Sequence, residues 1–355
     1  MAPKFVRANV RALHGYTPGE QPAIGERVVK LNTNENPFPP SAKVMQAIRE
    51  IEPEALRRYP NPTADAFRDA AARVLGVKRD NILAGNGSDD VLTVVTRTCL
   101  PPGGTLAFPS PTYSLYPVLA AIEDARSAAV AWEPGWRLPT EALLATGADA
   151  IYLANPNAPS GTFVPPAAVA ALARAFDGVL LIDEAYVDFA DDNCLALVAD
   201  HPNVVISRTL SKAYALAGLR FGYAVAQEPL IAQMMKVKDS YNCDAIAAAA
   251  AAAAIDDQDY ARMTWANVRG ERTRVAEELT KLGFDVLPSS ANFLLAKVPG
   301  DARSLYTDLK DMGILIRYFD APGLREYVRV TIGTGQENNA LLGGVRSLLT
   351  KEKAA

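Results

Sequence analysis

Residues 207–223 read SRTLSKAYALAGLRFGY and come directly after a short apolar stretch that is typical of a buried strand. Lys212 stands among small and hydroxyl-bearing residues just past the end of that strand. A lysine in such a place is usually a solvated surface charge. Here Thr209, Ser211 and Arg220 lie close by in sequence. They provide two hydroxyl groups and a guanidinium group, a set suited to a phosphate dianion.

A lysine beside a phosphate site is placed to form a Schiff base with an aldehyde that carries the phosphate. Pyridoxal phosphate is such an aldehyde, and its ring needs a carboxylate near the pyridine nitrogen to work as an electron sink. Asp183 ends the apolar stretch 179–182 and is the candidate for this carboxylate. In isolation, an aspartate at the end of a strand more often caps the following turn. Tyr186, three residues later, can donate its phenol to the ring oxygen of the cofactor.

Two further motifs fit the same cofactor. Residues 85–88, GNGS, lie between an expected strand and helix, where backbone N–H groups can face a phosphate. Such a turn is weak evidence by itself, and the absence of a GxGxxG motif leaves little support for a dinucleotide-binding fold. Tyr113, in the segment 109–113 (PSPTY), can stack on a planar ring, although a core aromatic is an equally good interpretation.

Composition excludes several other classes of protein. The 355 residues include 36 Lys and Arg against 40 Asp and Glu, a net charge of −4, with no basic run of the kind that binds nucleic acid. The longest apolar stretch, 245–255, is shorter than the roughly 18 residues of a membrane-spanning helix. The N-terminal segment lacks the apolar core of a signal peptide. We therefore expect neither a nucleic-acid partner nor a membrane partner.

Histidine and cysteine are scarce. There are two histidines, His14 and His201, and three cysteines without CxxC spacing, so no metal site is expected. The odd cysteine count argues against a disulfide scaffold and fits a reducing cytoplasm. Catalysis that relies on histidine or metal is disfavoured, which leaves room for a cofactor.

The order of elements predicts an α/β fold. Short apolar strands alternate with helices between residues 81 and 226, which favours a mostly parallel central sheet. A long helical stretch at 244–282 follows, and it contains eight consecutive alanines. The expected strands are 105–108, 150–153, 179–182, 204–207 and 223–226, and the expected helices are 89–100, 166–176 and 229–236.

The last part of the chain predicts a smaller α+β unit, completed by the N-terminal segment. We expect a large cofactor-binding domain over 41–265 and a small domain formed by 1–40 with 266–355. The expected elements after 290 are strands at 293–298, 314–317 and 328–332 and helices at 302–311 and 336–349.

Taken together, the motifs resemble those of the fold-type I, pyridoxal-phosphate-dependent aminotransferases, and most closely the histidinol-phosphate aminotransferases. The resemblance runs from about residue 31 to 349. It implies a three-layer αβα domain with a mostly parallel sheet, plus the smaller α+β domain. The motifs are LNTNENPFPP (31–40), RYPNPTADAFRDA (58–70), GNGSDDVL (85–92), FPSPTYSLY (108–116), NPNAPSG (155–161), LIDEAYVDF (181–189), SRTLSKAYALAGLRFGY (207–223), ANFLLAKV (291–298) and VRVTIGT (328–334).

The resemblance also implies roles for single residues. Lys212 matches the lysine of the internal aldimine that shuttles the proton, Asp183 matches the partner of the pyridine nitrogen, and Tyr186 matches the ring-oxygen donor. Tyr59 resembles the tyrosine that reaches the cofactor phosphate of a second subunit, which implies a homodimer with a shared active site. The remaining cofactor-binding candidates are the stacking Tyr113, the phosphate ligands Ser88, Asp89, Thr209, Ser211 and Arg220, and Asn157.

The substrate residues follow in the same way. Arg329 matches an arginine that holds a substrate carboxylate, and Arg317 lies where the histidinol-phosphate enzymes place a ligand for the substrate phosphate. Tyr16 and Asn34 are further candidates for the substrate pocket. One position departs from the pattern: Ala158 replaces an asparagine that is a second partner of the ring oxygen, and either the adjacent Asn157 or Tyr186 alone takes that role.

The expected reaction is a ping-pong transamination between histidinol phosphate and 2-oxoglutarate, as in histidine biosynthesis. An aromatic amino-acid aminotransferase fits the same motifs nearly as well. A pyridoxal-phosphate lyase of the threonine-phosphate decarboxylase type, and a non-catalytic regulatory protein, are more distant alternatives, since a fold does not fix a function.

Overall fold

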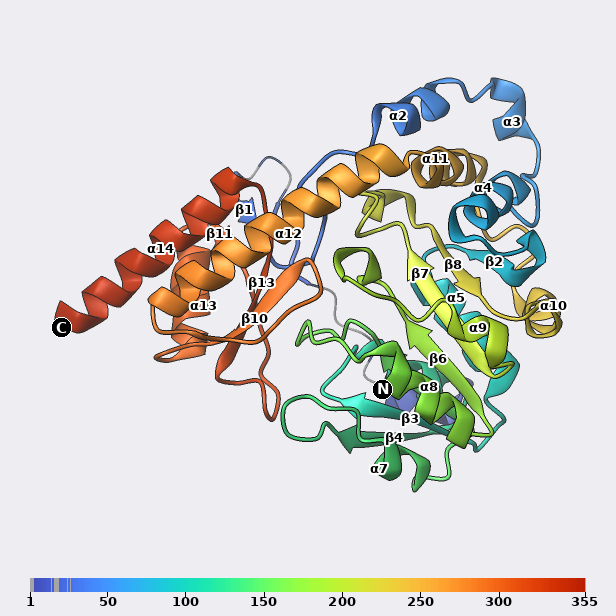
Figure 1. Ribbon diagram of the computed structural model, residues 1–355, viewed down its shortest axis with the longest axis horizontal. Helices are drawn as coiled ribbons and strands as arrows, with labels where there is room; N and C mark the ends of the chain where they lie inside the picture. The colour runs from blue at the N-terminus through green and yellow to red at the C-terminus, as the bar shows by residue number, and fades with distance from the viewer. Residues whose placement is uncertain (1–2, 14, 16–18, 24, 26, 355) are drawn as a thin grey trace.

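The computed structural model describes residues 3–13, 15, 19–23, 25 and 27–354, and a seven-stranded sheet forms its centre (Figure 1). Four adjacent pairs of strands are parallel, from β7 across to β4, which confirms the expected mostly parallel sheet. The two pairs that involve β8 are antiparallel. The strand order is β2 (Ile82–Gly85), β8 (Gly222–Val225), β7 (Val204–Thr209), β6 (Val179–Asp183), β5 (Ala150–Ala154), β3 (Thr105–Ser110) and β4 (Arg126–Ala131).

Helices cover both faces of this sheet, so its inner strands are apolar at nearly every position. Ile182 and Ile206 point into one core, while Leu181 and Val205 point into the other. The first core is closed by α2 (Ala42–Arg49), α4 (Asp65–Leu75), α8 (Pro166–Ala175) and α11 (Ala245–Asp256). The second is closed by α5 (Ser88–Cys99), α6 (Leu115–Ile122) and α10 (Glu228–Val237).

The expected long helix at 244–282 is two helices. Asp244 caps α11 by accepting a hydrogen bond from the backbone N–H of Ala247. The helix ends at Asp257, where φ −92° and ψ 58° depart from helical values, and α12 (Gln258–Lys281) then begins. The alanine run of α11 packs closely against α2 and α4.

A second, smaller core includes residues of α12 and belongs to the part of the molecule at the left of Figure 1. It is built on a four-stranded antiparallel sheet in the order β12 (Arg317–Tyr318), β13 (Tyr327–Thr331), β10 (Phe293–Lys297) and β9 (Asp285–Val286). Helices α13 (Ala302–Asp311) and α14 (Gly335–Ala354) pack on it, and β1 (Val29–Lys30) pairs with β11 (Ile314–Leu315). Through β1, the N-terminal part of the chain contributes a strand to this unit. The expected strand 314–317 is split into β11 and β12.

The expected domain boundary at residue 265 falls inside α12. Ala261, Trp265 and Val268, on both sides of that point, all pack in the smaller core. Short helices complete the fold: α1 (Ala8–Ala12), α3 (Pro53–Arg57), α7 (Thr140–Leu144), α9 (Leu197–Asp200), and the 3-10 turns η1 (Arg79–Asn81), η2 (Val187–Phe189) and η3 (Ala217–Leu219). Among the described residues, no helix has the length and apolar character needed to cross a membrane.

Candidate active site

The carboxyl ends of β5, β6 and β7 meet at one edge of the central sheet, the place where α/β sheets bind ligands. Lys212 follows β7 at this edge and is half-buried. Its Nζ donates a hydrogen bond to the carbonyl of Thr33 at 3.0 Å. Burial, together with the positive charge of Arg329, lowers the pKa of Lys212 to about 8. An amine with such a pKa can accept and return a proton near neutral pH.

Asp183, at the end of β6, is 5% exposed. Its Oδ2 accepts a hydrogen bond from the phenol of Tyr116 at 3.0 Å, while Oδ1 is buried and has no hydrogen-bond partner among the described residues. Burial raises the pKa of Asp183 to about 7, and the negative charge of Asp89 acts in the same direction. A buried carboxylate oxygen without a partner is costly, and a cation or an N–H donor at this point removes the cost.

Sequence reasoning missed Tyr116. It is fully buried and lies three residues after Tyr113, on α6, with its ring edge-on to Tyr113 and Tyr152. The available signal was its place in the segment 108–116, since a tyrosine at an otherwise apolar helix position needs a partner for its hydroxyl group. That partner is Asp183.

The expected phosphate ligands come together at the start of α5. Ser211 Oγ accepts hydrogen bonds from Thr209 Oγ1 at 3.0 Å and from Arg220 at 3.1 Å. The guanidinium group of Arg220 lies 3.7 Å from Asp89, which also accepts a hydrogen bond from Tyr113. Ser88 is the first residue of α5, and the first N–H groups of a helix have no helical partners and can bind an anion.

Two glycines allow this close approach. A Cβ on Gly87, where φ is +86°, would lie 2.5 Å from the guanidinium group of Arg220. A Cβ on Gly222 would lie 2.4 Å from the backbone nitrogen of Ser88. Side chains at these positions would push Arg220 and the start of α5 apart. The two glycines therefore let Thr209, Ser211, Arg220 and the first turn of α5 lie close together. We call this group of backbone and side-chain donors the phosphate cradle.

Tyr186 lies between the two units. Its ring packs edge-on against Phe293 at a centroid distance of 5.0 Å, and its hydroxyl oxygen accepts a hydrogen bond from Asn34 Nδ2 at 3.0 Å. Ala158, the position that departs from the family pattern, packs in the same small cluster as Phe293.

Asn157 is fully buried and its amide is occupied. Nδ2 donates to Ser160 Oγ at 2.8 Å and to the carbonyl of Pro111 at 3.2 Å, and Oδ1 accepts from Thr112 at 2.8 Å. Both amide hydrogens are therefore used within the protein, and neither is left for a ring oxygen. The neighbouring turn thus takes up the side-chain amide of Asn157.

Arg317 and Arg329 face each other on adjacent strands. They are direct partners in the antiparallel register of β12 and β13, and both guanidinium groups lie 5.4 Å from the ring of Phe319. Like charges at paired positions repel unless an anion lies between them. Arg317 forms no ion pair with any residue that the structure describes. Arg329 is close enough to Lys212 to lower the pKa of that lysine. The two guanidinium groups are donors of the kind that bind a carboxylate or phosphate.

One expected residue, Tyr59, lies at the surface, and another cannot be compared with this group. Tyr59 is 81% exposed, and its ring stacks on Tyr241 at a centroid distance of 4.5 Å. Tyr16 lies outside the described residues.

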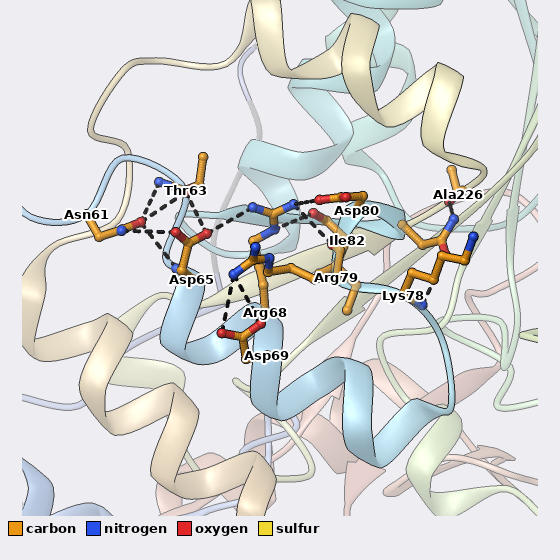
Figure 2. A network of polar contacts seen from close by, with 11 residues as sticks. Asn61, Thr63, Asp65, Arg68, Asp69, Lys78, Arg79, Asp80, Ile82 and Ala226 are labelled. Carbon is orange, nitrogen blue, oxygen red and sulfur yellow. Dashed lines mark hydrogen bonds and ion pairs between the residues drawn. The ribbon is translucent and has the colours of Figure 1, made fainter.

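A polar network holds the loop that carries Tyr59 (Figure 2). Arg68, on α4, donates to the carbonyl of Ile82 at the start of β2 and contacts Asp65. Asn61 accepts hydrogen bonds from the backbone of Thr63 and of Asp65. The loop is thereby tied to the strand that leads into the phosphate cradle.

Comparison with known proteins identifies the family to which the chain belongs. The sequence pattern described as aminotransferase class I and II matches residues 26–345. The chain belongs to this family. This aminotransferase is 47% identical, over 97% of its length and 99% of the relative's, to histidinol-phosphate aminotransferase 1 of Trichormus variabilis. It is 44% identical to the histidinol-phosphate aminotransferase of Rhodopirellula baltica, over 92% and 91% of the two chains.

Solved structures agree with the assignment. The histidinol-phosphate aminotransferase of Sinorhizobium meliloti, determined in complex with pyridoxal-5'-phosphate, superposes with a TM-score of 0.89 at 29% identity, covering 98% of this aminotransferase and 99% of that chain. The expected family and fold class are confirmed.

Proposed function

We propose that this aminotransferase transfers an amino group between L-histidinol phosphate and 2-oxoglutarate, with pyridoxal 5'-phosphate held at Lys212. The observation that carries the proposal is the Arg317–Arg329 pair, of which Arg329 lies close enough to Lys212 to lower its pKa. A guanidinium group binds phosphate or carboxylate in a fork of hydrogen bonds. Histidinol phosphate has a phosphate and no carboxylate, whereas glutamate has two carboxylates, so one arginine pair serves both substrates.

The residues present fit pyridoxal phosphate. When bound, this cofactor supplies an electron sink for the pair of electrons released when the α-proton leaves. Asp183 offers its unpartnered Oδ1 to hold a proton on the ring nitrogen. Thr209, Ser211, Arg220 and the start of α5 bind the phosphate.

Lys212 carries the proton in this scheme. Its lowered pKa leaves a useful fraction of neutral amine near pH 8, which removes the α-proton of the donor and later returns it. Tyr113 lies beside Asp89 at the edge of the cradle and is placed to cover one face of a planar ring. The arginine pair orients the anionic end of the substrate away from the reacting carbon.

The test is a panel of single half-reactions. The purified protein, loaded with pyridoxal phosphate, is mixed separately with L-histidinol phosphate, phenylalanine, tyrosine and glutamate, and loss of the visible absorption of the lysine-bound cofactor is followed. We expect histidinol phosphate and glutamate to react fastest. A much faster reaction with phenylalanine would identify an aromatic amino-acid aminotransferase, and release of CO₂ would identify a decarboxylase. Retained absorption and turnover after Lys212→Ala would contradict the proposal altogether.

We propose further that the active unit is a homodimer in which Tyr59 reaches the cofactor phosphate of the second subunit. The exposed Tyr59–Tyr241 stack supports this, since a pair of aromatic rings at the surface is typical of an interface. The network of Figure 2 fixes the loop that presents it.

The dimer is tested by mixing two inactive variants, Lys212→Ala and Tyr59→Ala. If each site takes its lysine and its tyrosine from different subunits, the mixed dimer contains one complete site and regains activity. If both residues belong to the same subunit's site, every site in the mixed dimer carries one of the two substitutions, and no activity returns after exchange of subunits.

The free state of Cys99, Cys194 and Cys243 supports a cytoplasmic location.

A further inference from the structure

Asn34 is buried between the two units of the molecule. It is 1% exposed and has a φ of 58°, in the left-handed region that asparagine tolerates better than most residues. It lies in the segment 31–40, which also places Thr33 against Lys212. The family resemblance implies a place in the substrate pocket, and the side chain donates a hydrogen bond to Tyr186.

The orientation of the Asn34 amide is fixed by the smaller unit. Thr331 Oγ1, at the end of β13, donates to Asn34 Oδ1 at 3.1 Å and accepts from the Asn34 backbone N–H at 3.0 Å. Asn292 Nδ2 donates to the Asn34 carbonyl at 3.0 Å. With Oδ1 engaged by a hydroxyl donor, the Nδ2 group must face the other way, and it donates to Tyr186 at 3.0 Å.

This contact determines what the Tyr186 hydroxyl can do. A phenol has one proton to donate and an oxygen that accepts. Because Asn34 donates to that oxygen, the tyrosine proton is not spent on Asn34 and remains available for another acceptor. In the proposed function that acceptor is the ring oxygen of pyridoxal phosphate, and the asparagine that the family places at position 158 is an alanine here.

We infer that Asn34 is a positioning residue, which holds Tyr186 as a hydrogen-bond donor toward the cofactor ring oxygen and links that donor to strand β13 of the smaller unit. The part that concerns the ring oxygen rests on the proposed function. The Asn34–Tyr186 link itself rests only on the geometry.

The first test uses the cofactor-free protein. Asn34 and Arg329 favour the ionised phenol, while burial raises the pKa of Tyr186. Removing the donor with Asn34→Gly, which suits the positive φ, should raise the Tyr186 pKa by about half to one unit, and Asn34→Asp should raise it further. The pKa is followed by the ultraviolet absorption of the phenolate, with the Tyr186→Phe protein subtracted. An unchanged Tyr186 pKa in both variants would overturn the link.

The second test uses the protein loaded with pyridoxal phosphate. In Asn34→Asp the carboxylate accepts the tyrosine proton, so the ring oxygen loses its donor. The pH midpoint of the visible absorption change should then rise by about one unit, since the deprotonated form of the lysine-bound cofactor carries negative charge on that oxygen. In the Tyr186→Phe background the same substitution should shift the midpoint by less than half as much.

The two backgrounds separate the outcomes. Equal shifts with and without the tyrosine would mean that Asn34 acts through charge or structure alone, which overturns the inference. A protein that binds no pyridoxal phosphate would contradict the proposed function, while the phenol titration would still decide the link. Thermal unfolding of each variant identifies any loss of folding.

Discussion

Asp183 and Glu184 are adjacent buried carboxylates that differ in how their oxygens are satisfied. Glu184 is 1% exposed, and both of its oxygens have partners: Oε1 accepts from the backbone N–H of Cys194, and Oε2 accepts from Arg208 at 2.8 and 2.9 Å. Asp183 has one partner, Tyr116, and one oxygen with none among the described residues. Both carboxylates are buried and lie at the carboxyl end of β6.

We infer from this difference that Glu184 has a structural role and that Asp183 is available to a ligand. Glu184 joins β6 to Arg208 of β7, so its charge is consumed within the fold. Asp183 keeps hydrogen-bonding capacity that the protein does not use, at a cost in stability. Asp183 is the last residue of β6 and Glu184 follows it, so neighbouring positions at this strand end have different partners.

We expect the largest effect from Asp183→Asn. Without the negative charge, the ring nitrogen of the cofactor is no longer held in its protonated form, so we expect transamination to fall by about 10²–10⁴-fold. Single-turnover rates with L-histidinol phosphate measure the effect. A loss of less than tenfold, with normal cofactor binding, would show that Asp183 is not the partner of the ring nitrogen.

Glu184→Gln should act on stability. The substitution keeps an acceptor for Cys194 and removes the ion-pair partner of the buried Arg208, which is then opposed only by the longer-range charge of Asp188. The free energy of unfolding should therefore drop by about 3–5 kcal/mol. Urea denaturation of the cofactor-free protein measures this. The double variant with Arg208→Met removes the stranded charge and should recover most of the loss. If Glu184→Gln instead abolished turnover without destabilising the fold, the assignment of roles would be reversed.

Asp183→Asn should have the opposite sign on stability in the cofactor-free protein. The folded-state pKa of about 7 lies above the ordinary value of 3.8, so the stability contributed by the neutral acid is complete below about pH 4 and lost as the pH rises through 7. At pH 8 the asparagine variant should therefore be more stable than the wild type by about 2–4 kcal/mol. Urea denaturation between pH 4.5 and 8 should show this gap closing toward low pH, and a gap independent of pH would contradict the cause.

Much of the fold was predictable because burial on both faces makes a strand uniformly apolar. The central strands at 105–110, 150–154, 179–183 and 204–209 were found within two residues for this reason. The strand β4 was missed because it is the sheet's edge and its residues are largely exposed. The antiparallel direction of β8 was not expected, since an apolar stretch carries no record of its direction.

The site likewise has residues that the sequence predicts and contacts that it does not predict. Lys212, Asp183 and the phosphate cradle follow strand ends, and local sequence predicts those. The Tyr116–Asp183 contact depends on how α6 packs against β6, and the Asn34–Tyr186 contact joins segments 152 residues apart. The occupied amide of Asn157 depends on the conformation of a turn. Contacts of these kinds are set by tertiary packing.

Tyr116→Phe gives the smallest and most specific test. It removes one hydrogen bond from Asp183 and little volume, because the ring remains in the core beside Tyr152. A hydrogen bond to a charged group is worth about 1.5–3 kcal/mol, so turnover should fall by roughly tenfold. In a plot of turnover against pH, the midpoint of the acid limb should rise by about one pH unit. The direction follows because the Tyr116 hydrogen bond lowers the pKa of Asp183, and its loss raises that pKa further.

Tyr152→Phe is the matched control. Tyr152 is an equally buried neighbour whose hydroxyl group contacts Thr96 at 2.8 Å and makes no hydrogen bond to Asp183. Both variants lose one buried hydrogen bond and should lose similar stability. Only Tyr116→Phe should move the acid limb. Equal shifts of the acid-limb midpoint in the two variants would mean that it responds to any disturbance of this core. The pKa of Asp183 would then depend on burial and not on the Tyr116 hydrogen bond.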